Sequence, residues 1–173
     1  MNLERALIEP IKLVIFDVDG VLTDGRIVMD NNGVESKFFD VRDGTGIKWL
    51  KRAGLEIAFL TGRESRVVEF RAAELGVDII RQGAKVKLTV YEEILDEFGL
   101  TDRKVAFAGD DLIDLPVLRR VGLSMAPADA RPEIKEAVHF VCQNAGGRGA
   151  VREMAEMILK GQGLWESITE RYY

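Results

Sequence analysis

The sequence KLVIFDVDGVLTDG, residues 12–25, is the stretch that most clearly indicates the fold of this chain. Its apolar run ends directly at Asp17 and Asp19, and a glycine-containing turn follows. A short, continuously apolar run of this kind is typical of a strand that is buried on both faces. Ionised carboxylates at the end of a buried strand are costly unless a partner compensates their charge. The stretch therefore predicts an inner strand that leads into a charged site.

Similar apolar runs recur along the chain and alternate with helical patterns. The predicted strands are residues 11–16, 55–60, 77–80, 104–108, 122–126 and 139–142. The predicted helices are residues 45–53, 64–75, 85–98, 115–121 and 149–159, and glycines that can adopt the left-handed conformation follow several of them. This alternation predicts an α/β fold, a three-layer, Rossmann-like, mainly parallel sheet with right-handed crossovers.

One segment departs from this alternation. Residues 25–39 contain two β-like arms around residues 30–33, and Asn32-Gly33 is a strong signal for a hairpin turn. A hairpin between the first strand and the first helix would protrude over the carboxyl ends of the strands. Ligands bind at those ends in sheets of this type.

The composition is that of a globular protein. The chain has 173 residues, 47% hydrophobic and 31% charged, so we expect one domain over residues 1–173 with a buried core. The net charge of -5 argues against nonspecific nucleic-acid binding. No apolar stretch reaches the roughly 20 residues of a membrane span, and residues 1–10 lack the apolar core of a signal peptide. One cysteine, Cys142, suits a reducing compartment, so we expect a cytoplasmic protein that binds neither membrane nor nucleic acid.

Polar residues gather after several of the predicted strands. They are Asp17 and Asp19 after the first strand, Thr61 and Arg63 after the second, Lys87 near the start of the third helix, and Asp110, Asp111 and Asp114 in GDDLID. Because parallel strands end at a common edge, we expect these groups to converge. Clustered carboxylates cannot all ionise without a cation, and their hard oxygen atoms suit Mg²⁺. A hydroxyl and an ammonium beside such an ion suit a phosphoryl group, so the pattern predicts a phosphoryl-transfer site.

The order of these motifs, DxDGVLT, TGR, a later lysine and GDDxxD, resembles the haloacid dehalogenase superfamily of phosphatases. The resemblance implies that Asp17 is the nucleophile and forms an aspartyl-phosphate. It implies that Asp19 is the general acid and then the general base. Thr61 would bind the transferring phosphoryl group, and Lys87 would neutralise its developing charge.

The same resemblance implies a metal site. The ion would be held by the side chain of Asp17, the backbone carbonyl of Asp19 and the side chain of Asp110. Asp114 would support the metal site or Lys87. Asp111 is a further candidate, although a carboxylate there can instead begin the following helix.

Longer stretches narrow the resemblance. FDVDGVLTDG, TGRES, QGAKVKL, GDDLIDLPVLRRVGLSMAPADA and GGRGAVRE are similar to the capless phosphatases that act on 3-deoxy-D-manno-octulosonate 8-phosphate, over about residues 11–162. The resemblance implies a Mg²⁺-dependent phosphomonoesterase of lipopolysaccharide core synthesis without a large cap domain. It also implies a homotetramer in which hairpins of neighbouring subunits help to close active sites near the subunit interfaces. The tail in that family can reach a neighbouring site, which draws attention to residues 163–173.

The resemblance also points to arginines that would bind the phosphorylated sugar acid. Arg63 in TGR and Arg71, eight positions later, are candidates for the carboxylate because arginine binds carboxylates in a planar, bidentate way. Arg148 in the GGRG turn is a third candidate. Arg71 fits an exposed helix face equally well.

Several residues have competing interpretations. Lys85 competes with Lys87 for the phosphate, and the family spacing after Gly83 favours Lys87. Cys142 to Arg148 spells C-x₅-R, the phosphate loop of cysteine phosphatases, but the residues around it differ from that motif, so a buried structural cysteine is favoured. His139 lies in AVHFV and is expected to be packed rather than catalytic.

Other functions fit part of the pattern. A phosphatase for nine-carbon sugar acids is the nearest alternative, but that group carries an acidic residue where Arg63 stands. A capless phosphatase of broad specificity is another. Phosphoaspartate receiver domains share the acidic cluster, the threonine and the lysine, but their order along the chain differs and Asp19 would have no role in them.

Overall fold

The computed structural model describes residues 5–173 and contains a six-stranded sheet. Its strands lie in the order β5-β4-β1-β6-β7-β8, and every neighbouring pair is parallel. They are β1 (Leu13–Phe16), β4 (Glu56–Leu60), β5 (Ile79–Arg81), β6 (Val105–Ala108), β7 (Leu123–Ala126) and β8 (Phe140–Val141). The predicted α/β fold with a parallel sheet is confirmed.

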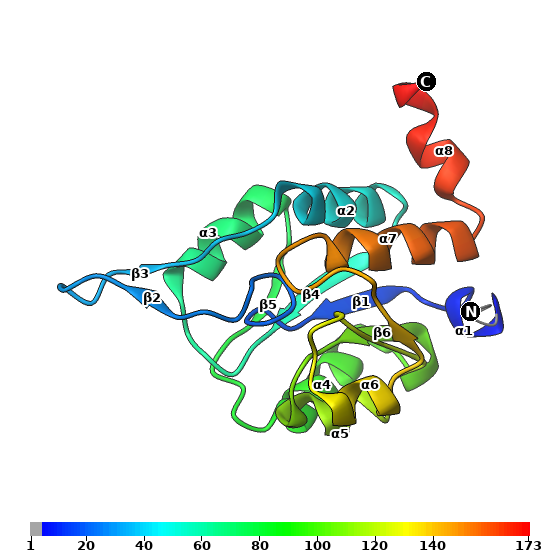
Figure 1. Ribbon diagram of the computed structural model, residues 1–173. Coiled ribbons are helices and arrows are strands. Elements are labelled where there is room, and N and C mark those ends of the chain that lie inside the picture. Colours follow the sequence, from blue (N-terminus) through cyan, green and yellow to red (C-terminus); the bar gives the residue numbers. More distant parts are fainter. Residues whose placement is uncertain (1–4) are drawn as a thin grey trace.

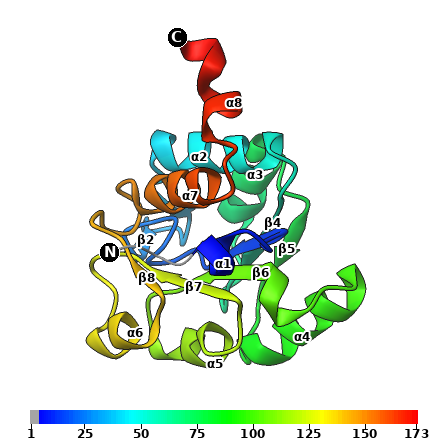
Figure 2. The same cartoon turned by 90° about the vertical axis from the view of Figure 1, so that its right-hand side faces the viewer.

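Helices cover both faces of the sheet, which gives three layers (Figures 1 and 2). One face is covered by α2 (Val41–Arg52), α3 (Arg66–Leu75) and α7 (Ala150–Gly161), and the other by α4 (Lys87–Phe98), α5 (Leu115–Leu118) and α6 (Pro132–Ala137). Successive residues of β1 point to opposite faces, so Val14 and Phe16 belong to the core under α2 and α7, and Leu13 and Ile15 to the core under α4. All four are fully buried, which explains the continuous apolar run in the sequence.

The strand register brings the ends of the inner strands together. Phe16, the last residue of β1, lies opposite Phe59 of β4 and Ala108 of β6. The residues that follow these strands therefore meet at one edge of the sheet, beyond β1.

Helices α2 and α7 pack at very short range. A Cβ atom added to Gly46 would lie 3.1 Å from the Cβ of Ala155, so glycine permits the close approach. Asp43 of α2 accepts the backbone N–H groups of Gly149 and Arg152, at 3.2 and 2.8 Å, and so caps the start of α7. These contacts fix the GGRG turn relative to the rest of the fold.

The segment between β1 and α2 forms the predicted hairpin, which protrudes beyond the sheet (Figure 1). Its paired strands are short, β2 (Val28–Met29) and β3 (Glu35–Ser36). Asp30 accepts the backbone N–H groups of Asn32 and Val34, and Gly33 has a φ of 78°, which suits the glycine of a tight turn.

Helix α8 (Trp165–Thr169) and the short 3₁₀ turn after it (Glu170–Tyr172) stand away from the layers in both views, and α1 (Arg5–Ile8) lies near the start of the chain (Figures 1 and 2). Trp49 of α2 holds the tail, because its Nε1–H donates to the hydroxyl of Tyr172 at 3.1 Å and its ring meets Trp165 edge to face. None of the helices in residues 5–173 is long and apolar enough to cross a membrane.

The predicted element boundaries differ from the observed ones in a few places. Helix α2 begins at Val41 rather than at residue 45, because Asp40 caps it by accepting the N–H of Arg42. Helix α5 ends at Leu118 rather than at residue 121. Helix α6 was not predicted, although Pro132 at its first position is a recognisable start signal.

Candidate active site

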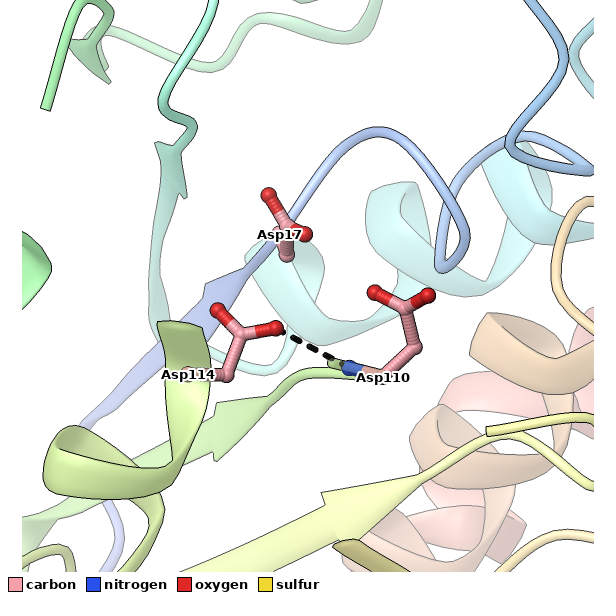
Figure 3. A group of neighbouring side chains, drawn as sticks. All are labelled: Asp17, Asp110 and Asp114. Carbon is pink, nitrogen blue, oxygen red and sulfur yellow. Dashed lines mark hydrogen bonds between the residues drawn. The ribbon is translucent and has the colours of Figure 1, made fainter. Parts of the chain in front are cut away.

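Carboxylates from two strand ends converge beyond β1 (Figure 3). Asp17 follows β1, Asp110 lies just after β6, and Asp114 ends the short turn before α5. One carboxylate oxygen of each lies within 4.8 Å of the others. Asp17 and Asp114 are buried and Asp110 is half-buried. This distance allows Asp17 and Asp110 to share a single cation, as the sequence predicts.

Lys87 lies between two of these carboxylates. Its Nζ is 2.8 Å from Oδ1 of Asp17 and 2.5 Å from Oδ1 of Asp114, and its side chain is almost fully buried. Lys87 is the first residue of α4, so the helix fixes the position of its backbone beside the carboxylates. Three carboxylates beside one ammonium leave an excess of two negative charges, which a divalent cation would balance.

The pKa values of Asp17 and Asp110 are raised because these carboxylates are buried close to other negative charges. Burial raises the pKa of Asp17 to about 7, and although Lys87 counteracts the shift, Asp114 adds to it. Burial also raises the pKa of Asp110 to about 8, helped by the negative charges of Asp17 and Asp114. Burial alone would lower the pKa of Lys87, but the two carboxylates outweigh it and the pKa rises. Lys87 is therefore protonated and positively charged, whereas Asp17 and Asp110 need a further positive charge nearby to be ionised together.

The oxygens of Asp114 already have partners. Oδ1 accepts from Lys87, and Oδ2 accepts the backbone N–H groups of Asp110 and Asp111 at 3.1 and 3.2 Å. Asp114 therefore orients Lys87 and the loop after β6. Asp111 is exposed and accepts the N–H of Leu112 at 2.7 Å, so it caps the following turn. Of the carboxylates in the predicted metal set, Asp17 and Asp110 are the ones best placed to hold the ion.

Glycines let the loops of the site approach one another. Gly20 has a φ of 97°, and a Cβ atom there would lie 2.1 Å from Oδ2 of Asp110. A Cβ atom on Gly146 would lie 1.8 Å from the backbone oxygen of Gly20. A Cβ atom on Gly147 would lie 2.5 Å from the backbone carbon of Thr23, so the GGRG turn packs directly on the loop after Asp17, and these contacts explain Gly146 and Gly147.

The convergence surrounds a cavity of about 270 Å³ at the sheet edge. Its lining includes Asp17, Asp19, Thr61, Arg63, Lys87, Asp110 and Asp111. Thr61 follows β4 and is buried, and its backbone is held by hydrogen bonds to Arg81 and Ala84. The structure therefore brings together the predicted nucleophile, acid, phosphate-binding and metal-binding residues in one cavity.

Asp19 has partners that the sequence did not predict. Lys37, just after β3, donates to Oδ1 of Asp19, and Nη1 of Arg63 lies 3.7 Å from Oδ2. Glu35 of β3 pairs with Nη2 of Arg63 at 2.7 Å and accepts from the hydroxyl of Ser65. Glu35 and Lys37 are two positions apart in an extended arm and so share a face, a signal that the sequence does carry.

The other predicted arginines lie outside this cavity. Arg71 pairs with Glu74 at 2.7 Å and stacks on the ring of Phe39. Arg148 is exposed and lies 3.9 Å from Asp24, beside a second cavity of about 370 Å³ that both residues line. Of the three candidates for the substrate carboxylate, Arg63 alone lines the cavity that contains Asp17.

The structure gives Cys142 and His139 structural surroundings. Cys142 is buried and its thiol donates to the backbone oxygen of Ala150 at 3.6 Å. Burial raises the pKa of this thiol well above its usual value, so it is protonated and a poor nucleophile. Nδ1 of His139 lies 2.8 Å from the hydroxyl of Ser124 and accepts the backbone N–H of that residue.

Comparisons with known proteins agree with this geometry. Residues 40–122 match the family model of haloacid dehalogenase-like hydrolases. The chain is 48% identical over 155 residues to the 3-deoxy-D-manno-octulosonate 8-phosphate phosphatase of Escherichia coli (strain K12), which covers 90% of this chain and 82% of the relative.

Solved structures show the same similarity over nearly the whole chain. The phosphatase of the same description from Yersinia pestis superposes with a TM-score of 0.91 at 44% identity, covering 94% of this chain and 89% of the other. The corresponding protein from Moraxella catarrhalis, solved in complex with magnesium ion, phosphate ion and KDO, superposes with a TM-score of 0.96 at 36% identity, covering 98% and 97%.

Proposed function

Because the chain belongs to the 3-deoxy-D-manno-octulosonate 8-phosphate phosphatases, a family of haloacid dehalogenase-like hydrolases, we propose that it hydrolyses this phosphate ester with Asp17 as the nucleophile. The observation that carries the proposal is the convergence of Asp17, Asp110 and Lys87 in one cavity at the sheet edge. It places a carboxylate, a site for a divalent cation and an ammonium around the position of one phosphoryl group.

The reaction has two steps in this proposal. In the first, a carboxylate oxygen of Asp17 bonds to phosphorus, the bond from phosphorus to the sugar oxygen breaks, and Asp19 gives that oxygen a proton. In the second, water attacks phosphorus, Asp19 takes a proton from the water, and the bond between Asp17 and phosphorus breaks. Asp17 and Asp19 end in their starting states, and the products are the sugar acid and phosphate.

The cofactor in this proposal is Mg²⁺. Asp17 and Asp110 supply hard oxygen ligands, and the excess negative charge of the cluster fits a divalent ion. When bound, the ion neutralises charge on the phosphoryl oxygens. Asp114 keeps Lys87 and the loop after β6 in place without being a ligand itself.

The remaining groups of the cavity bind the substrate. Lys87 compensates charge on the phosphoryl group, and Thr61 donates its hydroxyl to a phosphoryl oxygen. Arg63 is the candidate for the sugar-acid carboxylate that the cavity supports best. Arg71 and Arg148 lie outside this cavity, so they are weaker candidates for that carboxylate.

We further propose that the chain assembles as a homotetramer through its hairpin. Met29, Val34 and Phe70 are 57%, 60% and 66% exposed, and they line a cavity of about 590 Å³ between the hairpin and α3. Exposed apolar clusters of this kind suit an interface between copies. Light scattering at micromolar concentration tests the assembly, with the double variant Met29→Ser and Phe70→Ser expected to dissociate. A monomeric wild-type chain would contradict the proposal.

A panel of phosphate esters assayed with and without Mg²⁺ tests the function. The panel contains the eight-carbon and nine-carbon 2-keto-3-deoxy sugar-acid phosphates and neutral sugar phosphates of similar size. We expect Mg²⁺-dependent phosphate release, fastest with the eight-carbon compound, in keeping with a cytoplasmic role in lipopolysaccharide core synthesis. Equal rates on all esters would leave a broad phosphatase, and no turnover would favour a receiver-type module.

A further inference from the structure

Lys37 has surroundings unlike those of its neighbours in the hairpin. Val34 and Phe38 are 60% and 68% exposed, whereas the side chain of Lys37 is 1% exposed. Its Nζ donates to Oδ1 of Asp19 and lies 3.5 Å from Oε1 of Glu35. Burying a lysine is costly unless its charge is paired, so these contacts determine where the side chain lies.

The contacts of Lys37 belong to a closed ring of charges. Two cations, Lys37 and Arg63, alternate with two anions, Asp19 and Glu35. Burial raises the pKa of Glu35, but the hydroxyl of Ser65 and the charges of Lys37 and Arg63 outweigh it, and the pKa is lowered overall. Glu35 therefore stays ionised and holds both cations beside Asp19.

We propose that Lys37 is a positioning residue for Asp19, and that Glu35 holds Lys37 in place. This rests on the proposed role of Asp19 in proton transfer. The ammonium of Lys37 takes Oδ1 of Asp19 and so fixes the rotation of the carboxylate. Nη1 of Arg63 lies 3.7 Å from Oδ2, so the two cations together set the orientation of the carboxylate. The hairpin thus contributes to catalysis within its own subunit, independently of any role in assembly.

Two other roles for Lys37 make different predictions. A lysine that binds the sugar acid directly would affect sugar substrates and leave simple aryl phosphates unchanged. A lysine that only holds the hairpin would affect all substrates alike and would act independently of Asp19. A positioning residue acts through Asp19, so its removal should matter most where the leaving group needs a proton.

A series of aryl phosphates with phenols of different acidity separates these roles, because phenols of high acidity leave without a proton. We expect Lys37→Met to lower kcat/KM about 10- to 100-fold for the least acidic phenols and only a few-fold for the most acidic. Lys37→Arg should restore part of the loss. Lys48→Met, which removes an exposed lysine of α2, is the matched control and should leave the series unchanged.

A double-mutant cycle with Asp19→Asn completes the test. If Lys37 acts through Asp19, Lys37→Met should have almost no further effect in the Asp19→Asn background. Independent, multiplying effects, or an equal loss along the whole series, would overturn the inference. If Asp19→Asn does not change how kcat/KM depends on the acidity of the phenol, Asp19 is not the general acid, and the proposed function rather than the role of Lys37 is wrong. Should Lys37→Met not fold, Glu35→Gln provides the second variant, with a smaller effect in the same direction.

Discussion

The strand-end cluster and the hairpin of residues 25–39 both reach the active site, but they are held in different ways. The cluster of Asp17, Asp110, Asp114 and Lys87 follows buried strands and carries excess negative charge. The hairpin has short strands and exposed apolar side chains, and its charged residues Glu35 and Lys37 form a balanced ring with Asp19 and Arg63. The strand ends therefore carry negative charge that a cation would balance, whereas the charged side chains of the hairpin are paired with Asp19 and Arg63.

The largest effect should come from the strand-end cluster. Asp17→Asn removes the nucleophile, so kcat should fall at least about 10⁴-fold while the fold is retained. Phosphate release and circular dichroism measure the two properties. Cys142→Ser is the control and should leave kcat within about threefold, because the thiol is buried and protonated. If Cys142→Ser abolished turnover and Asp17→Asn did not, the nucleophile would lie in the C-x₅-R loop and not in the strand-end cluster.

Removal of Lys87 should affect both rate and stability. Lys87→Met leaves Asp17 and Asp114 without their shared cation, so in chelator the free energy of unfolding should fall by about 3–5 kcal/mol. We expect kcat to fall about 10²- to 10⁴-fold with Mg²⁺ present. Urea unfolding and phosphate release measure these changes, and Lys85→Met, which removes an exposed lysine nearby, should change neither. If Lys85→Met is the damaging variant, the assignment of the phosphate-binding lysine is wrong.

The different success of prediction in the two regions has a physical cause. Asp17 follows β1 directly and Asp110 follows β6 after one glycine, and parallel strands end at a common edge, so the meeting of these residues follows from the sequence pattern. The contact between Lys37 and Asp19 depends on how the hairpin folds back, and no local pattern determines that path.

The same distinction applies to the helices. Asp40 caps α2 two residues from its partner, which is a local signal that sequence reasoning can use. Asp43 caps α7 across a separation of 106 residues, and this contact follows only from the packing of α2 against α7. Local signals therefore predicted most of the strands and long helices, although the cap at Asp40 and the start of α6 at Pro132 were missed, and packing set the contacts that connect the elements.

The charge excess of the cluster should appear in the thermal stability of the metal-free chain. Both Asp17 and Asp110 have pKa values raised from 3.8, to about 7 and about 8, so the folded state binds more protons than the unfolded state between about pH 4 and pH 8. Their contribution to stability is complete below about pH 4 and is lost as the pH rises to about 8. In chelator, Tm should therefore fall from pH 5 to pH 8, and Mg²⁺ should raise it mainly at pH 8.

Asp110→Asn isolates this effect from other titrating groups. In chelator at pH 8 the variant should melt above the wild type, by about 2–4 °C for each kcal/mol of repulsion removed, and at pH 5 the difference should vanish. The variant should also lose the Mg²⁺ response. Differential scanning calorimetry measures all of these. A variant that melts below the wild type at pH 8 in chelator would show that the cluster tolerates its charge without a cation.

The smallest effect should come from the hairpin tip, and it compares the two regions directly. Gly33 and Gly54 both have positive φ, 78° and 86°, and a Cβ atom at either position meets nothing within 4 Å. Alanine therefore introduces the same backbone strain, about 1–2 kcal/mol, at the tip and at the end of α2. Gly54→Ala should lower Tm by about 2–8 °C because α2 unfolds with the core.

Gly33→Ala should lower Tm less than Gly54→Ala and change kcat/KM by less than about threefold, because an exposed tip can open locally without unfolding the sheet. Lys37 is anchored at the other end of the hairpin by Asp19 and Glu35, so its position does not depend on the turn. Calorimetry and the aryl phosphate series measure both variants. If Gly33→Ala makes kcat/KM depend more steeply on the acidity of the phenol, as Lys37→Met is expected to do, the hairpin tip and Asp19 form one cooperative unit. The hairpin would then be coupled to the reaction as tightly as the strand ends are.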